Sequence, residues 1–169
     1  MSGFRNTVNV RCRAGRVLFL GSVGRPVSLP AGAAAAMLCF MAHPITRTGH
    51  CLCRAVKFTA RGAPRFISNC HCESCRRASS APSLTWARFL DAQVAISGEA
   101  LREFPSSPGV IRSFCGRCGS PIAFRGERWP GETHLTVCAF DAPETMAPTS
   151  DHLAEEKLPW AALLGRGGS

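Results

Sequence analysis

The sequence predicts a small all-β domain with short helices, built from two or more antiparallel sheets. From Gly49 onwards the chain divides into short segments rich in Val, Ile, Phe and Thr, separated by turn residues such as Gly and Pro. Helices suit only two short stretches, one directly after Pro143 and one at residues 75–79. Closely spaced cysteines occur throughout the same region, as is typical of a small domain that binds metal ions.

The first expected strand is residues 55–59, where Val56 and Phe58 alternate with polar residues and therefore share one face. Residues 65–68 form a second apolar segment that leads directly into a cysteine cluster. Residues 83–88 combine Leu, Thr and Trp, which favour strands. We therefore expect three strands in the first half of the domain.

Five further strands are expected in the second half. Residues 94–97 end at Gly98, and residues 101–104 precede a Pro- and Gly-containing turn at 105–109. Residues 110–114 then run directly into another cysteine cluster. The last two expected strands are residues 122–124 and 134–137. We find no internal repeat, and we expect the Leu-Pro-Trp segment at 158–160 to dock on the domain.

The first 40 residues differ in composition from the rest of the chain. They are rich in Arg, Gly, Ala and Val and contain no acidic residue. A targeting peptide is one interpretation of such a segment, but its apolar stretch lies far from the start. We therefore expect residues 1–40 to be an N-terminal extension, either disordered or translated from a start upstream of Met41. The zinc domain would then span residues 41–164, followed by a flexible tail at 165–169.

The positive charge is spread thinly over the expected domain. The whole chain has a formal net charge of +9. Residues 1–40 hold five Arg and no acid, so residues 41–169 carry the remaining +4. No basic run is longer than Arg76-Arg77, and aromatic residues do not alternate with basic ones as stacking on bases requires. We therefore expect no nucleic-acid partner. No apolar run approaches the roughly 20 residues that span a bilayer, so we expect no membrane partner either.

The spacing of the ten cysteines favours metal binding over disulfides. Seven of them form Cys-x-Cys and Cys-x-x-Cys patterns, which suit thiolate ligands in a reducing cytoplasm better than a secreted disulfide framework. The other three are expected to be small buried or incidental thiols: Cys12, Cys39 and Cys138.

One group of four thiols is expected to close a structural zinc site. Cys115 and Cys118 flank a tight turn of the zinc-knuckle type, which supplies only two of the four ligands. Cys51 and Cys53 are the preferred second pair, because residues two apart in a strand point the same way. The alternative is that the second cysteine cluster pairs with the knuckle.

Cys70, Cys72 and Cys75 remain as a three-thiol group within six residues. A fourth ligand could come from His71, His134 or water. His71 lies between two ligands in an extended loop, so we expect its ring to point away from the ion. It would then lie either behind the ligands or on the surface. The group then leaves one coordination position open, and an open position is typical of catalytic zinc. We expect His50, His134 and His152 to be structural.

The sulfur-only ligand set indicates the kind of chemistry. Three thiolates make zinc a weak activator of water, whereas a thiol that coordinates the ion still ionises. The expected reaction is thiol activation, with an aldehyde as the electrophile. Arg76 and Arg77 follow Cys75 directly and are expected to hold carboxylates of an anionic thiol. Trp86 and Phe89 could form a pocket wall or belong to the core.

Four segments resemble the glutathione-dependent formaldehyde-activating enzyme family. They are Gly49–Phe58, Asn69–Arg77, Phe114–Gly119, and a C-terminal part with Asp151-His152 and Glu156–Trp160. They occur in the family's order and spacing, over about residues 42–163.

This resemblance implies a small zinc-bearing β-tent fold. It implies two zinc ions per chain, one structural at Cys51, Cys53, Cys115 and Cys118, the other linked to catalysis at Cys70, Cys72 and Cys75. The implied activity is condensation of formaldehyde with glutathione to S-hydroxymethylglutathione, classed as a carbon–sulfur lyase. The implied partners are thus a small-molecule thiol and a small aldehyde.

Two features of the chain depart from the family pattern. Many family members have Gly where this chain has Arg54, and residues 1–40 have no family counterpart. The family also includes a branch resembling centromere protein V, which acts in chromosome and cytoskeleton organisation. The alternative hypothesis is therefore a non-catalytic zinc domain that binds nucleic acid or protein. The low charge of the domain favours the enzyme.

Overall fold

The computed structural model describes residues 11–12, 15–16 and 45–162. Strands β1 (Arg11–Cys12) and β2 (Gly15–Arg16) pair antiparallel in a unit of their own, Met1–His43. The rest of the expected N-terminal extension and the expected tail at 165–169 lie outside the described residues. The other described residues, 45–162, belong to the second unit, Pro44–Ser169.

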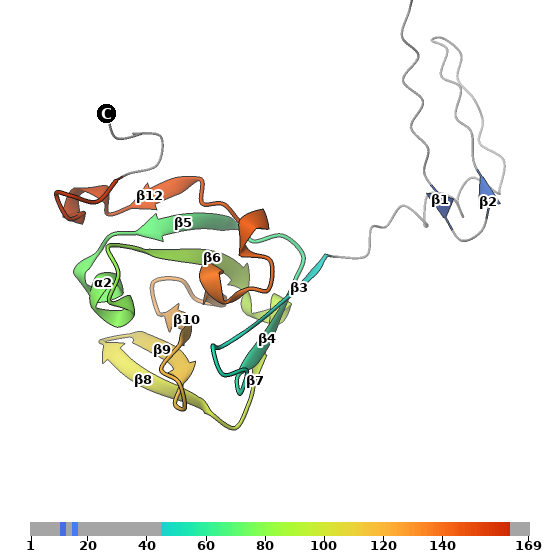
Figure 1. The fold of residues 1–169 in the computed structure, drawn as a ribbon, viewed down its shortest axis with the longest axis horizontal. Helices are drawn as coiled ribbons and strands as arrows, with labels where there is room; N and C mark the ends of the chain where they lie inside the picture. Colours follow the sequence, from blue (N-terminus) through green and yellow to red (C-terminus); the bar gives the residue numbers. More distant parts are fainter. Residues whose placement is uncertain (1–10, 13–14, 17–44, 163–169) are drawn as a thin grey trace, which may run out of the picture. The chain divides into compact units, whose positions relative to one another are not determined.

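The second unit contains two β-sheets (Figure 1), which confirms the expected all-β fold. The smaller sheet has the strand order β3-β4-β7 and is antiparallel throughout. Its strands are β3 (Thr46–His50), β4 (Lys57–Arg61) and β7 (Val94–Ser97). The larger sheet has the order β12-β5-β6-β11-β10-β9-β8, and only its β12–β5 pair is parallel.

The strands of the larger sheet are β5 (Phe66–Cys70), β6 (Leu84–Leu90), β8 (Leu101–Ser107), β9 (Val110–Cys115), β10 (Pro121–Gly126), β11 (Glu132–Thr136) and β12 (Ser150–His152). The α-helix in this unit is α2 (Glu73–Ser79). Single 3₁₀ turns lie at Asp91–Gln93, Val137–Ala139, Pro143–Thr145 and Ala154–Glu156.

All eight strands expected from the sequence are present, β7 with the expected ends and the other seven with shifted ends. The first is displaced from residues 55–59 to Lys57–Arg61, because Cys51 to Val56 form a turn instead. The fifth continues beyond residue 104 through Pro105 to Ser107. A proline is tolerated there because β8 is an edge strand. The expected helix at 75–79 is α2, whereas the one after Pro143 is only a single 3₁₀ turn.

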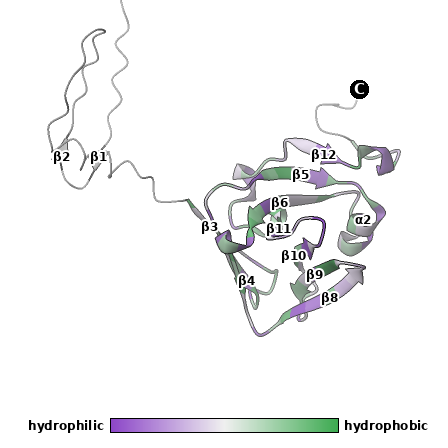
Figure 2. Cartoon of the chain, turned by 180° about the vertical axis from the view of Figure 1, so that it is seen from behind, coloured by the Kyte–Doolittle hydropathy of each residue, from purple (hydrophilic) through white to green (hydrophobic). Residues whose placement is uncertain are grey.

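Strands β3 and β12 were not expected. Both lie at the edges of their sheets and lack an alternating apolar pattern. In Figure 2, β12 is pale to purple, whereas β5 beside it begins with hydrophobic residues. Edge strands need not bury a side-chain row, so their sequences carry little periodic signal.

The main core lies where the two sheets meet. The smaller sheet contributes Val56, Phe58 and Ala60 on and beside β4, and the larger sheet contributes residues such as Phe89 and Leu135, all at most 2% exposed. This burial uses one face of the larger sheet and leaves the other face for the site.

The other face of the larger sheet carries a cross-strand row of aromatic and basic side chains. The register aligns Phe66, Arg88, His134, Phe124 and Arg112 on neighbouring strands β5, β6, β11, β10 and β9. Directly paired residues share a face, so their side chains stack. The Arg88 guanidinium lies 4.2 Å from the centre of the Phe66 ring, and the ring centres of His134 and Phe124 are 4.2 Å apart.

Candidate functional site

The first cysteine cluster unites the Cys51-Cys53 pair with the Cys115-Cys118 knuckle. The four sulfur atoms lie within 4.8 Å of one another. The Cys51 and Cys53 sulfurs are 3.6 Å apart, and those of Cys53 and Cys115 are 3.7 Å apart. The alternative pairing of the knuckle with the second cluster is therefore wrong.

Two tight turns present these four thiols. The Arg54 N–H donates to the Cys51 carbonyl, and the Gly119 N–H donates to the Cys115 carbonyl. Arg54 has φ 62° and Gly119 has φ 77°, so both occupy the left-handed region. This region favours glycine, which explains why a glycine is usual at the position of Arg54 in the family that the sequence resembles.

The second cluster lies where β5 meets α2. Cys70 ends β5, Cys72 caps α2 by accepting a hydrogen bond from the Cys75 N–H at 3.3 Å, and Cys75 lies in the first turn of the helix. The sulfurs of Cys70 and Cys72 are 3.5 Å apart, and all three lie within 4.8 Å of one another. The structure thus brings the three predicted thiols together on one loop.

Both clusters have dimensions that fit a metal ion. Zinc–sulfur bonds of about 2.3 Å in a tetrahedron place sulfurs about 3.8 Å apart, close to the measured 3.5–3.7 Å. All seven thiols are free, with no disulfide among the described cysteines. Each cluster also receives an N–H hydrogen bond at sulfur, from Val56 to Cys51 and from Cys75 to Cys72. The two clusters could therefore each hold a metal ion, and a sulfur-only set favours zinc or iron.

Cys75 is the most acidic thiol of the second cluster. Its pKa is lowered to about 5, mainly by a hydrogen bond from Cys70 and further by the Trp86 indole N–H and the Arg112 guanidinium. The indole nitrogen lies 3.4 Å from the Cys75 sulfur. The pKa of Cys70 is raised by the same interaction with Cys75. Negative charge in this cluster therefore concentrates on the sulfur nearest to Trp86 and Arg112.

His71 is buried behind the second cluster. It is 1% exposed, and its Nε2 lies 2.8 Å from a carboxylate oxygen of Asp151 on β12. It lies outside the group of three sulfurs, as expected for a residue that points away from them. The alternative of a surface position is wrong, because the parallel pairing of β12 with β5 covers the ring. Sequence analysis missed β12 and therefore missed this contact.

A cavity of about 450 Å³ opens beside the three thiols. Cys70, Cys72 and Cys75 line it together with aromatic side chains from the larger sheet and from the turn between β10 and β11. These are Phe66, Trp86, Phe124 and Trp129. Strand alternation explains why Trp86 faces the cavity, whereas Phe89, three residues later, is 0% exposed in the main core.

The cavity is lined by bases and by no acid of the described residues. Its basic side chains are Arg112, Arg128, His134 and His152. Arg76 and Arg77, predicted to bind substrate, line a different hollow with Leu158 and Trp160. Arg77 also pairs with Glu73 at 2.7 Å. A substrate contact by Arg76 or Arg77 stays a prediction, and Trp160, expected to dock, is 72% exposed.

Sequence analysis did not assign a role to Arg112. Its guanidinium Nη2 lies 3.0 Å from the Ser74 hydroxyl and 3.9 Å from the Cys75 sulfur. The available signal was strand alternation, since Arg112 and Phe114 occupy the same face of the strand that ends at Cys115. That signal does not say which thiol cluster the face meets.

His134 lies in the wall of the cavity and is held by aromatic rings. It is 3% exposed, and its Nε2 is buried without a hydrogen-bond partner among the described residues. Its ring centre is 5.3 Å from that of Trp129 in addition to the contact with Phe124. Burial, with the nearby charges of Arg88 and His152, lowers the pKa of His134 to about 4. The side chain is therefore neutral near pH 7.

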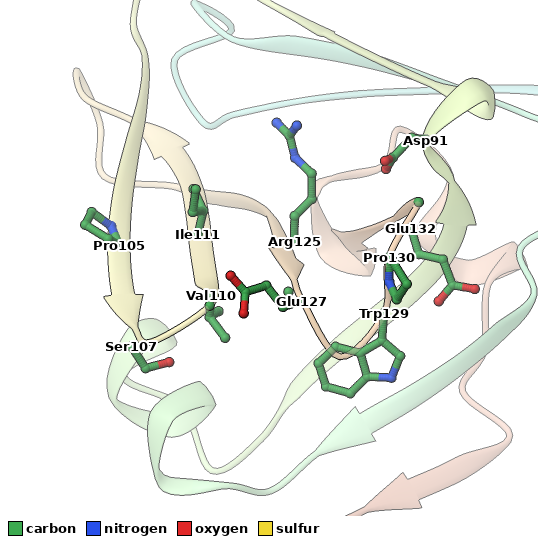
Figure 3. Close-up of a pocket in the computed structure, with 13 residues that line it drawn as sticks. Asp91, Pro105, Ser107, Val110, Ile111, Arg125, Glu127, Trp129, Pro130 and Glu132 are labelled. Atoms are coloured by element: carbon green, nitrogen blue, oxygen red, sulfur yellow. The ribbon is translucent and has the colours of Figure 1, made fainter.

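A second hollow of about 400 Å³ adjoins the first but differs in charge (Figure 3). Ser107, Val110 and Trp129 line both hollows. Among the described residues that line the second hollow there is no cysteine, and some carry acidic side chains, of which Figure 3 shows Glu127 between Val110 and Trp129. Its other acids are Asp91 and Glu132. The absence of acids is thus a property of the thiol cavity and not of the whole surface around it.

Comparison with known proteins finds a family model, one similar protein sequence and one similar solved structure. Residues 46–156, more than half of the chain, match the family model described as glutathione-dependent formaldehyde-activating enzyme. A Schizosaccharomyces pombe protein named as an uncharacterized lyase is 33% identical over 76 residues, which cover 45% of this chain and 55% of that protein. The chain thus matches about half the length of this relative.

A solved Rhodobacter sphaeroides protein is 19% identical, with a TM-score of 0.49 over 62% of this chain and 99% of that one. Separately, no helix in the described residues has the length and apolar character needed to cross a membrane.

Proposed function

Because the chain belongs to the glutathione-dependent formaldehyde-activating enzyme family, we propose that it is a carbon–sulfur lyase-type enzyme that adds a small-molecule thiol to a small aldehyde. The observation that carries this proposal is the group of Cys70, Cys72 and Cys75 beside a cavity rich in aromatic and basic side chains. The name of the yeast relative, a lyase, supports the same class of reaction.

The two clusters take different roles in this proposal. Cys51, Cys53, Cys115 and Cys118 hold a structural zinc, since four protein sulfurs complete a tetrahedron. Cys70, Cys72 and Cys75 would hold a second zinc, and a set of three protein ligands is typical of a catalytic zinc site. When bound there, the ion supplies a positive charge that favours ionisation of the substrate thiol.

The protein's own side chains then orient the reactants. The aromatic wall around Trp86 and Phe124 packs against the aldehyde and excludes water, which would otherwise hydrate it. The sulfur lone pair forms the carbon–sulfur bond, and the carbonyl π electrons move onto oxygen. That oxygen takes a proton from solvent, which replaces the proton lost when the thiol ionised. The basic cavity stabilises the negative charge that passes from sulfur to oxygen.

An exchange measurement tests the proposal. Thiol and formaldehyde combine reversibly without a catalyst, so the yield of adduct does not report catalysis. The exchange rate between free and adduct thiol is therefore measured by magnetisation-transfer NMR with the full chain. We expect about two zinc ions per chain and faster exchange, with the acceleration lost in Cys72→Ser. Absence of acceleration by a metal-loaded chain would contradict the enzyme. A DNA or RNA affinity that falls steeply with salt would instead favour the non-catalytic domain.

A further inference from the structure

Arg112 is a cation at the cavity that pairs with no acid in the part of the chain that the structure describes. Its neighbours on the larger sheet are paired: Arg88 lies 3.2 Å from Glu132, and Arg125 lies 3.1 Å from Glu103. Arg112 forms no ion pair with any acid of the described residues, although its side chain is only partly exposed. A guanidinium withdrawn from water normally has a counter-ion. This cation therefore has the environment of a site that a ligand completes.

The hydrogen bonds of Arg112 use only part of its guanidinium. Its Nη2 donates to the Ser74 hydroxyl and lies near the Cys75 sulfur. Its Nε has no acceptor among the described residues, and no hydrogen bond within that part of the chain involves Nη1. A guanidinium can hold a carboxylate with two parallel N–H groups. Arg112 can thus contact the thiol cluster on one edge and still have donors for an anion.

The surroundings favour an anion at this place. The positively charged Arg128 lines the same cavity, and no acid of the described residues does so. The Arg112 guanidinium also lies 5.8 Å from the centre of the Phe124 ring. The Phe124 ring in turn contacts the His134 ring. The acids instead line the adjoining hollow of Figure 3. The charges that line the cavity therefore favour a negatively charged substrate group beside Arg112.

We propose that Arg112 determines thiol specificity by binding a carboxylate of the substrate while its other edge contacts the Cys75 sulfur. This inference rests on the proposed thiol addition. It assigns to Arg112 the role that the sequence predicted for Arg76 and Arg77. Arg77 already forms an ion pair with Glu73. Arg76 and Arg77 both line a different hollow.

Two matched thiols test the proposal in the full, metal-loaded chain. 3-Mercaptopropionate carries a carboxylate, and 2-mercaptoethanol is its neutral counterpart. We expect kcat/KM, divided by the uncatalysed rate of each thiol, to favour 3-mercaptopropionate by about 10- to 100-fold, as for hydrogen bonds between charged groups. Arg112→Met removes this preference and Arg112→Lys retains part of it. Arg76→Met and Arg77→Met, the matched controls, retain it in full.

A binding measurement separates recognition from chemistry. Propionate, which has the carboxylate and no thiol, is titrated into each variant by NMR, and the metal content of each is counted. Propionate binds wild type and Arg112→Lys but not Arg112→Met. Equal preference for both thiols in wild type, or an unchanged preference in Arg112→Met, overturns the proposal, as does loss of the preference in Arg77→Met. Failure of wild type to accelerate either thiol would instead contradict the proposed function.

Discussion

His134 should make the stability of the domain depend on pH, and His134→Phe should remove that dependence. The unfolded chain protonates this histidine near pH 6.5, whereas burial and the charges of Arg88 and His152 lower its pKa in the folded protein to about 4. Between these values the unfolded state binds a proton that the folded state does not. The free energy of unfolding therefore falls as the pH falls from about 6.5, and this loss is complete near pH 4.

The magnitude follows from the two pKa values. The full difference of about 2.5 units corresponds to about 3 kcal/mol. At about pH 5.5 the free energy of unfolding should be about 1.4 kcal/mol lower than at about pH 8 because of His134. This pH is preferred to pH 4 because more metal should remain bound. His134→Phe keeps an aromatic ring against Phe124 and Trp129 but carries no titratable nitrogen. The variant should also be no less stable at about pH 8, because the Nε2 that it removes has no partner among the described residues.

The assay is urea unfolding of wild type and variant at both pH values, with the same zinc concentration. Loss of metal in acid affects both proteins, so the difference between their pH dependences isolates His134. His152→Gln is the control, because it removes one of the two neighbouring charges and should reduce the difference without abolishing it. Parallel stability curves for wild type and His134→Phe between pH 8 and 5.5 would refute the reasoning.

Three further predictions concern a turn, a close packing contact and the two thiol clusters. Arg54→Gly should raise the free energy of unfolding by about 0.5–1 kcal/mol, because φ 62° suits glycine; an unchanged or lower midpoint in urea would contradict this. Gly49→Ala should destabilise by about 1–3 kcal/mol, since its Cβ would lie 2.2 Å from the Phe58 ring and 2.4 Å from a backbone carbonyl; a thermal midpoint equal to wild type would be inconsistent with the packing. Cys118→Ser should unfold the domain, whereas Cys72→Ser should lose about one zinc and the activity with the fold kept; circular dichroism and metal counting distinguish the two, and equal destabilisation would oppose separate roles.

The thiol groups were largely predictable because metal ligands come as local sequence patterns. Cys70, Cys72 and Cys75 lie on one loop, so their meeting depends on residues close in sequence. The pairing of Cys51-Cys53 with the knuckle was the better of two sequence interpretations, and the structure selects it.

The charged part of the cavity was not predictable in the same way. Arg76 and Arg77 follow a cysteine in sequence, but α2 turns them toward another hollow. Arg112 is 37 residues from Cys75 and reaches it only because β9 lies in the same sheet as β5 and β6. No periodic pattern in the sequence marks such a long-range contact.

By itself, the sequence determined the secondary-structure class, most strands and the seven sulfur atoms available to metal, since alternation and ligand spacing are local properties. Only the tertiary structure decided which side chains surround the three thiols. The strand order β5-β6-β11-β10-β9 aligns Phe66, Arg88, His134, Phe124 and Arg112 in one row. Register between distant strands sets that row, and register is settled by burying the opposite face of the sheet in the core.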